Sequence, residues 1–122
     1  MCAINGIFSM TKSISVNDLE SLNQMNSILS HRGPDDEGSF NDNSCILGHR
    51  RLSILDLSSL GHQPFYSESG RYILTYNGEI YNYVELRDNL KSLGFKFKTQ
   101  QMDILMVARL HLVWRKCFFK NI

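Results

Sequence analysis

The sequence predicts one domain that contains both helices and strands, because segments with helical periodicity occur beside short runs typical of strands. The strand signal is clearest at Tyr72–Tyr76, where all five residues are common in sheets. The helical signal is clearest just after Asn82, where leucines recur every three or four residues. The chain has 122 residues, 43% of them hydrophobic and 20% charged, which suits a single globular domain with a modest core.

The first predicted element is a strand over Ala3–Phe8, where apolar residues are frequent. A helix is predicted next, capped by Asn17 with Glu20 three residues on, and running to about Ser30. The polar segment His31–Gly38 holds a proline and two glycines, so it is predicted to be a loop. The apolar residues at helical spacing are Val16, Leu19, Leu22, Met25, Ile28 and Leu29.

The middle of the chain is predicted to form two strands, Ser44–Leu47 and Leu52–Leu57. They would be joined by a basic turn at Gly48–Arg51, which could face an anion. Further turns are expected at Gly61–Pro64 and Ser67–Gly70.

The strand Tyr72–Tyr76 should end at the dipeptide Asn77-Gly78, which suits positive φ and on its own is typical of an ordinary hairpin turn. A second helix is then predicted, with Asn82 as its cap and Gly94 as its stop. Its apolar stripe consists of Tyr83, Leu86, Leu90 and Leu93.

The end of the chain is predicted to hold a short strand, Phe95–Lys98, and a mostly apolar helix, Asp103–Trp114. That helix is too short and too often interrupted for the roughly 20 apolar residues of a membrane span. After Asp103 the chain has four basic residues and no acid, which suggests a truncated or frame-altered gene product.

Charge and cysteine usage narrow the function classes. A net charge of +1 disfavours a dedicated nucleic-acid binder. The three cysteines form no Cys-x-x-Cys pair, which disfavours a disulfide framework and a zinc site, so a reducing, cytoplasmic location is expected. His31, His49 and His62 match no zinc pattern with Cys2, so no metal is expected and the histidines are predicted to be loop residues bonded to backbone.

Cys2 is the candidate nucleophile. Removal of Met1 would give it a free α-amino group, whose reference pKa of about 7.7–8.0 suits a general base near neutral pH. One residue would then supply both nucleophile and base. Any protein may have Cys at its second position, however, so the other motifs must decide.

Three phrases accompany Cys2, namely His31–Asp35, Gly48–Ile54 and Tyr76–Asn82. In this order and spacing they resemble the glutaminase domain of the class II glutamine amidotransferases, most closely the asparagine synthetase branch. We therefore read the chain, residues 1–122, as part of such a domain, with clear resemblance over 1–100, a divergent tail over 101–122, and no synthetase domain.

The resemblance implies the α+β class and an N-terminal-nucleophile hydrolase fold, an αββα sandwich of antiparallel sheets that would be incomplete here. It implies that Cys2 attacks the side-chain amide of glutamine, and that Asn77 and the Gly78 N–H form the oxyanion hole. Arg51 would pair with the glutamine α-carboxylate, leaving Arg50 exposed. The resemblance also places Ile54 and Glu79 among the substrate-binding residues.

One motif departs from the family. Its Ser-Asp-Thr-Glu stretch, whose Asp binds the glutamine α-amino group, is replaced here by Thr99–Ile104, which puts Met102 in the place of the acid. Asp103 lies one residue later, about 100° around a helix, and remains the candidate partner. An ammonium buried without a carboxylate costs on the order of 3–5 kcal/mol.

The function implied is the glutamine-hydrolysing part of an asparagine synthetase, which releases ammonia for the amidation of aspartate. L-glutamine would be the substrate, and a separate synthetase domain or subunit the partner. The sequence lacks the Ser-Gly-Gly nucleotide loop of that domain, so ATP and magnesium are expected only there. A homodimer stays open, as do two alternatives: a non-catalytic remnant, and a glutaminase serving another carboxylate or a sugar phosphate.

Overall fold

The computed structural model describes residues 2–54, 57–67, 70–78, 81–94 and 117–121. It confirms the α+β class, with antiparallel sheets and two α-helices in the described part. The first half contains β1 (Ala3–Phe8), α1 (Val16–Ile28), a 3₁₀ turn (Leu29–His31), β2 (Asp36–Asn41) and β3 (Cys45–Arg51). The second half contains a 3₁₀ turn (Ser59–Gly61), β4 (Phe65–Tyr66), β5 (Tyr72–Tyr76), α2 (Tyr83–Ser92) and β6 (Cys117–Asn121).

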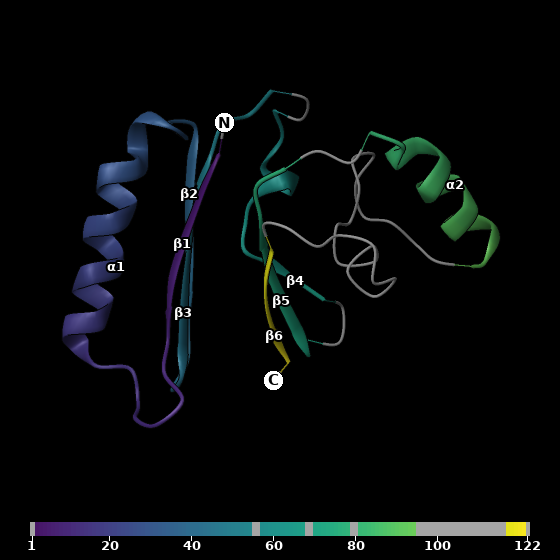
Figure 1. Cartoon of the computed structure of the whole chain (residues 1–122). Coiled ribbons are helices and arrows are strands. Elements are labelled where there is room, and N and C mark those ends of the chain that lie inside the picture. Colours follow the sequence, from purple (N-terminus) through teal and green to yellow (C-terminus); the bar gives the residue numbers. More distant parts are fainter. Residues whose placement is uncertain (1, 55–56, 68–69, 79–80, 95–116, 122) are drawn as a thin grey trace.

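Two three-stranded sheets form the centre of the molecule, one in the order β1-β3-β2 and the other in the order β4-β5-β6. Helix α1 covers the outer face of the first sheet, and the second sheet packs on its inner face (Figure 1). The core between the sheets includes Cys45 and Leu47 of β3, Ile73 of β5 and Phe40 of β2. Helix α2 stands on the far side of the second sheet (Figure 1).

Strand β3 is the central strand of the first sheet, and six of its seven residues are buried. Side chains alternate between the faces of a strand, so neighbours in the sequence meet different layers. The face toward α1 carries Gly48, which lies against Asn26 of the helix. The opposite face carries Leu47 and, two residues on, His49 and Arg51.

The prediction of a turn at Gly48–Arg51 is wrong, since these residues complete β3. The strand predicted at Leu52–Leu57 is wrong as well, because its described residues form no strand. The loop predicted at His31–Gly38 ends early, since Asp36 already begins β2. Polar residues suggested exposed turns here, whereas the strand is buried at six of its seven residues, and its two arginines bond Glu37 and the Ser58 carbonyl oxygen.

Helix α1 begins two residues earlier than expected. Ser15, rather than Asn17, is the cap, and it forms a capping box with Asp18, in which each side chain bonds the other residue's backbone N–H. Asn82 does occupy the cap position of α2, but its side chain makes no capping hydrogen bond. Gly94 follows this helix with φ at +88°, as expected for a residue that ends a helix.

The strands predicted at Ala3–Phe8 and Tyr72–Tyr76 are confirmed at both ends. β6 lies in the tail and pairs with β5, from Tyr72 opposite Asn121 to Tyr76 opposite Cys117. The elements predicted at Phe95–Lys98 and Asp103–Trp114 lie outside the described residues. In the part of the chain that the structure describes, neither helix has the length and apolar character to cross a membrane.

Candidate functional site

Three strand ends meet at one end of the first sheet. β1 starts there, β3 finishes there and β2 starts there, with Ala3 opposite Arg50 and Asp36 opposite Arg51. One step beyond Ala3 in the same register, Cys2 falls opposite Arg51. Residues directly opposite in an antiparallel pair share a face. The fold therefore brings Cys2 and Arg51, two residues singled out in the sequence, to the same edge and face.

The Cys2 thiol lies against the backbone just after β3. Its sulfur is 3.3 Å from the Leu52 nitrogen, which donates to it, and 3.7 Å from the Leu52 carbonyl oxygen. Cys2 is a free cysteine and is only partly buried. A partly exposed thiol on rigid backbone is a reasonable nucleophile, because it can be reached without being mobile.

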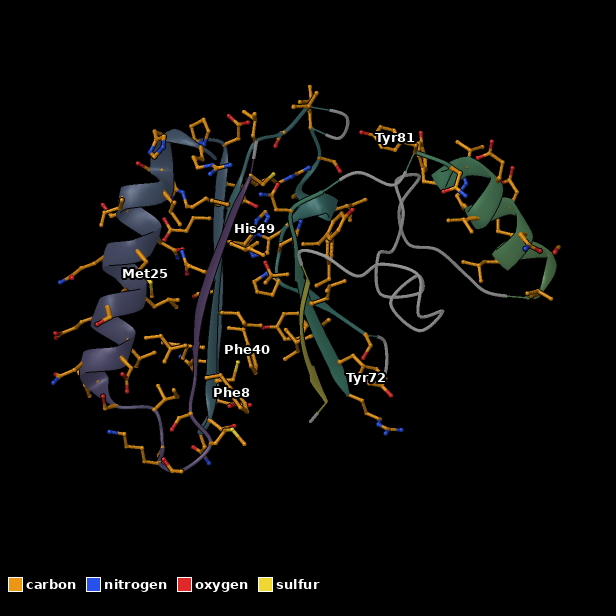
Figure 2. The ribbon with its side chains drawn as sticks, in the orientation of Figure 1. Phe8, Met25, Phe40, His49, Tyr72 and Tyr81 are labelled. Atoms are coloured by element: carbon orange, nitrogen blue, oxygen red, sulfur yellow. The ribbon has the colours of Figure 1, made fainter. Side chains whose placement is uncertain are left out.

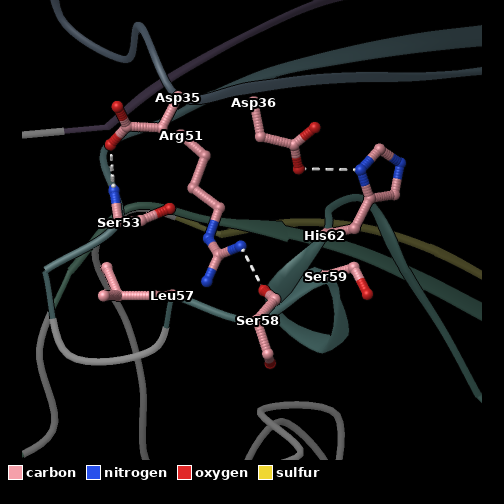
Figure 3. A pocket seen from close by; sticks show the side chains of 8 residues that line it. All are labelled: Asp35, Asp36, Arg51, Ser53, Leu57, Ser58, Ser59 and His62. Carbon is pink, nitrogen blue, oxygen red and sulfur yellow. Dashed lines mark hydrogen bonds and ion pairs between the residues drawn. The ribbon is translucent and has the colours of Figure 1, made fainter.

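Arg51 is the main cation of a cavity of about 750 Å³, which is within the usual size for a small-molecule site. It is only 8% exposed. Its Nη1 donates to the Ser58 carbonyl oxygen at 2.8 Å, and its guanidinium lies beside Gly61, where a Cβ would come within 2.2 Å of Nη2. The cavity is lined by Asp35, Asp36, Arg51, Ser53, Leu57, Ser58, Ser59 and His62 (Figure 3).

Two carboxylates share this cavity with Arg51. Asp35 accepts a hydrogen bond from the Ser53 backbone N–H at 2.7 Å, and Asp36 pairs with the His62 ring at 2.8 Å (Figure 3). The cavity thus presents a guanidinium and two acids within one lining, which suits a small ligand carrying both charges. The sequence analysis missed Asp35, Asp36 and His62 as cavity residues, although Asp35 lies in a phrase it had singled out.

Asn77 and Gly78 follow the end of β5, as predicted, but they do not turn into a hairpin. They are not among the described residues that line the cavity. The Tyr76 N–H, just before them, donates a hydrogen bond to Gln63 Oε1 at 2.7 Å, and the Tyr76 backbone lies against buried His49. These contacts tie the end of β5 to β3 two residues before Arg51.

Other predicted site residues are placed differently or not at all. Ile54 is 69% exposed and is not among the described residues that line the cavity, so its assignment to the substrate site gains no support. Glu79 and Asp103 lie outside the described residues. Arg50, expected to be exposed, has a side chain only 12% exposed and pairs with Glu37 under α1.

The histidines also differ from the prediction. His31 does bond backbone, at 2.8 Å from the Ile28 carbonyl oxygen. His62 pairs with a carboxylate instead, and His49 is a strand residue that is 1% exposed. Burial lowers the pKa of His49 to about 4, so its imidazole is neutral at pH 7. Within the described ranges, no group of three or more His, Cys, Asp or Glu side chains could hold a metal ion.

Comparison with known proteins gives consistent matches. A family model described as a glutamine amidotransferase domain matches residues 1–119. Asparagine synthetase [glutamine-hydrolyzing] 1 of Bacillus subtilis is 41% identical over 109 residues, which cover 88% of this chain and 17% of that protein. A putative asparagine synthetase [glutamine-hydrolyzing] 2 of Methanocaldococcus jannaschii is 44% identical over 106 residues, covering 72% of this chain and 20% of that protein. The chain thus spans about a fifth of the length of these relatives.

Proposed function

The chain belongs to the glutamine amidotransferase domain family, and from this premise we propose that it hydrolyses the side-chain amide of glutamine with Cys2 as the nucleophile. The observation that carries the proposal is the register of the first sheet. Continued by one step beyond Ala3, this register sets Cys2 opposite Arg51. Arg51 lines the charged cavity, whereas Cys2 is not among the described residues that line it and lies against the Leu52 backbone beside it. A nucleophile beside a buried guanidinium suits a substrate that carries a carboxylate near the bond to be broken.

The proposed reaction uses protein groups alone. After removal of Met1, the Cys2 α-amine takes the thiol proton, and the sulfur attacks the side-chain carbonyl carbon of glutamine. The tetrahedral intermediate collapses to a thioester as the amine passes the proton to the leaving nitrogen, which departs as ammonia. Water then attacks the thioester, glutamate is released, and the thiol is restored.

Two groups after β5 would stabilise the oxyanion. The Asn77 side-chain amide and the Gly78 backbone N–H are donors at the end of a strand held between buried partners. Loss of one such donor typically costs about 2.7–4 kcal/mol of transition-state stabilisation. Because donors of this kind act by their position, the fixed end of β5 supports this assignment.

The ends of the substrate would be held by opposite charges. Arg51 would bind the α-carboxylate of glutamine. For the α-ammonium, the lining of the cavity offers Asp35 and Asp36, while Asp103 stays a prediction from the sequence. Both charged ends of the amino acid would thereby be neutralised.

The released ammonia would serve the amidation of aspartate, in keeping with the relatives named asparagine synthetase. ATP and magnesium would belong to a synthetase domain or subunit rather than to the residues described. The two stacked antiparallel sheets with α1 outside them are compatible with the αββα sandwich of N-terminal-nucleophile hydrolases, which is part of the proposal. A cytoplasmic location and a homodimer remain predictions.

The test is glutamate release from glutamine by the purified chain and by Cys2→Ala. We expect the substitution to abolish release, because no other described thiol lies near the cavity. Cys45→Ala, which alters a buried thiol in the core, is the matched control and should remain active. Intact mass reports whether Met1 has been removed. Equal release by Cys2→Ala and the unaltered chain would refute the proposal.

A further inference from the structure

The backbone N–H of Tyr76, the last residue of β5, is bonded by the side chain of Gln63. In a regular sheet a backbone carbonyl of the neighbouring strand would accept this hydrogen bond. β4 pairs with β5 from Phe65 opposite Leu74, and two steps further along this register Gln63 is opposite Tyr76. The Tyr76 N–H donates to the Gln63 side-chain oxygen at 2.7 Å. Both residues are only 7% exposed. The amide side chain of Gln63 thus extends the ladder beyond the two residues of β4.

The second sheet is not the only support for Tyr76. His49 of β3, on the first sheet, is 1% exposed and lies against the Tyr76 backbone. Figure 2 shows His49 between the two sheets, on the side toward β5. The end of β5 is therefore bonded by Gln63 on one side and packed against buried His49 on the other.

The position of Tyr76 also limits that of Gly78. A Cβ on Gly78 would lie 2.6 Å from the Tyr76 hydroxyl oxygen, closer than any ordinary contact. The tyrosine side chain thus packs directly against the Gly78 backbone. A shift of Tyr76 would move the two residues proposed to face the oxyanion.

Resting on the proposed function, we propose that Gln63 is a positioning residue of the reaction: by accepting the Tyr76 N–H it fixes Asn77 and Gly78 in the geometry that the oxyanion requires. Gln63 is not among the described residues that line the cavity, so it acts through Tyr76 rather than on the substrate. His49 supports the same residue from the other sheet.

A purely structural role for Gln63 predicts a different outcome. If Gln63 only completed the sheet, its loss would lower the unfolding free energy and leave the kinetics of the folded fraction unchanged. A positioning role predicts a lower kcat with little change in KM, because oxyanion contacts form only as the reaction proceeds. Misplacement of reacting groups by about 1 Å can cost on the order of a hundredfold in rate.

The experiment compares Gln63→Met, which removes the acceptor at similar size, with Gln63→Glu, which keeps an acceptor oxygen. We expect Gln63→Met to lower kcat about tenfold to a hundredfold and to change KM less than about threefold, and Gln63→Glu to restore part of the loss. Gln24→Met, the same replacement on the exposed side of α1, is the matched control. Arg51→Lys should instead raise KM, since it weakens the carboxylate contact.

A measurement on the unaltered chain keeps the test independent of folding and of catalysis. NMR should detect a coupling across the hydrogen bond from the Tyr76 nitrogen to the Gln63 side-chain carbonyl carbon. Hydrogen exchange of the Tyr76 amide should be slow in the unaltered chain and faster in Gln63→Met. An inactive unaltered chain that shows this coupling would refute the proposed function and leave the contact established. An active Gln63→Met with unchanged kcat, or a missing coupling, would overturn the positioning role.

Discussion

Arg51 shows how one side chain can depend on several parts of the chain. The last pairs of β3 bring it opposite Asp36 and next to the start of β1. The segment after β3 returns over it, so that the Ser58 carbonyl accepts from its Nη1 and Gly61 leaves room for the guanidinium. A cation only 8% exposed and bonded in this way has little rotational freedom left. It can therefore recognise a carboxylate by direction as well as by charge.

The two described thiols should differ in reactivity. Burial raises the pKa of the Cys45 thiol, and Cys45 is 5% exposed, whereas Cys2 is partly exposed. We expect iodoacetamide at pH 8 to modify Cys2 at least about tenfold faster than Cys45, because the thiolate is the reacting form and must be reached. Peptide mapping by mass spectrometry measures both rates.

Labelling in urea is the control for this comparison, since unfolding exposes both thiols and should make the modification rates of Cys2 and Cys45 similar. Native labelling of Cys45 as fast as that of Cys2 would contradict the burial described here.

At the scale of single residues, the roles assigned to Cys2 and Arg51 stay predictions, and the surroundings of neighbouring residues were harder to predict. Cys2 and Arg51 were found from the spacing of motifs, and the fold brings them together. Arg50 was misplaced because adjacent strand residues point to opposite faces, and the sequence did not show that α1 covers the second face. Ion pairing with Glu37 beneath that helix compensates the burial of Arg50.

Among the elements, α1 is joined to the first sheet by polar as well as apolar contacts. Leu22 is buried against the sheet, but so is Asn26, which accepts from the Asn5 side chain at 2.7 Å and donates to Glu37 at 3.1 Å. Meanwhile Val16 and Ile28, both part of the apolar stripe, are exposed. Hydrogen bonds are directional, so this group fixes the rotation of the helix about its own axis.

The cap of α1 gives a prediction at the same scale. Ser15→Ala should lower the unfolding free energy by about 1 kcal/mol, because it removes the acceptor for the Asp18 N–H at the start of the helix. Urea denaturation followed by circular dichroism measures the change.

Asn17→Ala is the matched control, since Asn17 was the cap expected from the sequence. It lies inside the helix, where alanine is the better helix former, so little loss is expected. A larger loss for Asn17→Ala than for Ser15→Ala would show that the helix begins at the later residue.

Strands were predicted well where their residues were apolar and poorly where they were polar. The ends of β1 and β5 agree with the prediction. β3 was cut short at Leu47 because Gly48, His49 and two arginines follow. Those residues are typical of a turn in isolation, but in the fold Gly48 lies against α1, Arg50 bonds Gly33 and Glu37, His49 lies against β5, and Arg51 lines the cavity. Such partners come from distant parts of the chain, so local patterns do not reveal them.

For the whole molecule, the contact between the two sheets sets both stability and pH dependence. Ile73 of β5 packs in this contact and is 1% exposed, and burial of such a side chain contributes roughly 1.5–3 kcal/mol. His49 lies in the same interface as a neutral imidazole. The pairing of one sheet on the other was not predicted from periodicity, which indicates faces but not what covers them.

The stability of the chain should fall as the pH drops from 6.5 toward 4. Over this range the unfolded chain protonates His49 first, because burial lowers its pKa in the folded state from 6.5 to about 4. The unfolding free energy should therefore fall by up to about 3 kcal/mol from this residue. Above pH 6.5 both states are neutral there, and the effect disappears.

Urea unfolding at pH 7 and pH 4.5 tests this expectation. In His49→Gln the unfolding free energy should fall less between pH 7 and pH 4.5, because the contribution of His49 is gone. His31→Gln, at an exposed site, should show the same fall as the unaltered chain. Identical pH dependence in His49→Gln and the unaltered chain would rule out this histidine as the source.

The pairing of β1 with β3 has a further consequence for how the amino end tolerates change. Because side chains alternate along a strand, inserting one residue between Cys2 and Ala3 while the pairs of β1 stay in place would turn the sulfur toward the helical side. Two inserted residues would restore the side but carry the sulfur some 7 Å past the Leu52 backbone, at about 3.4 Å per residue. A longer segment between Cys2 and β1 would thus carry the sulfur away from Leu52 and Arg51 while the pairs of the first sheet stay in place.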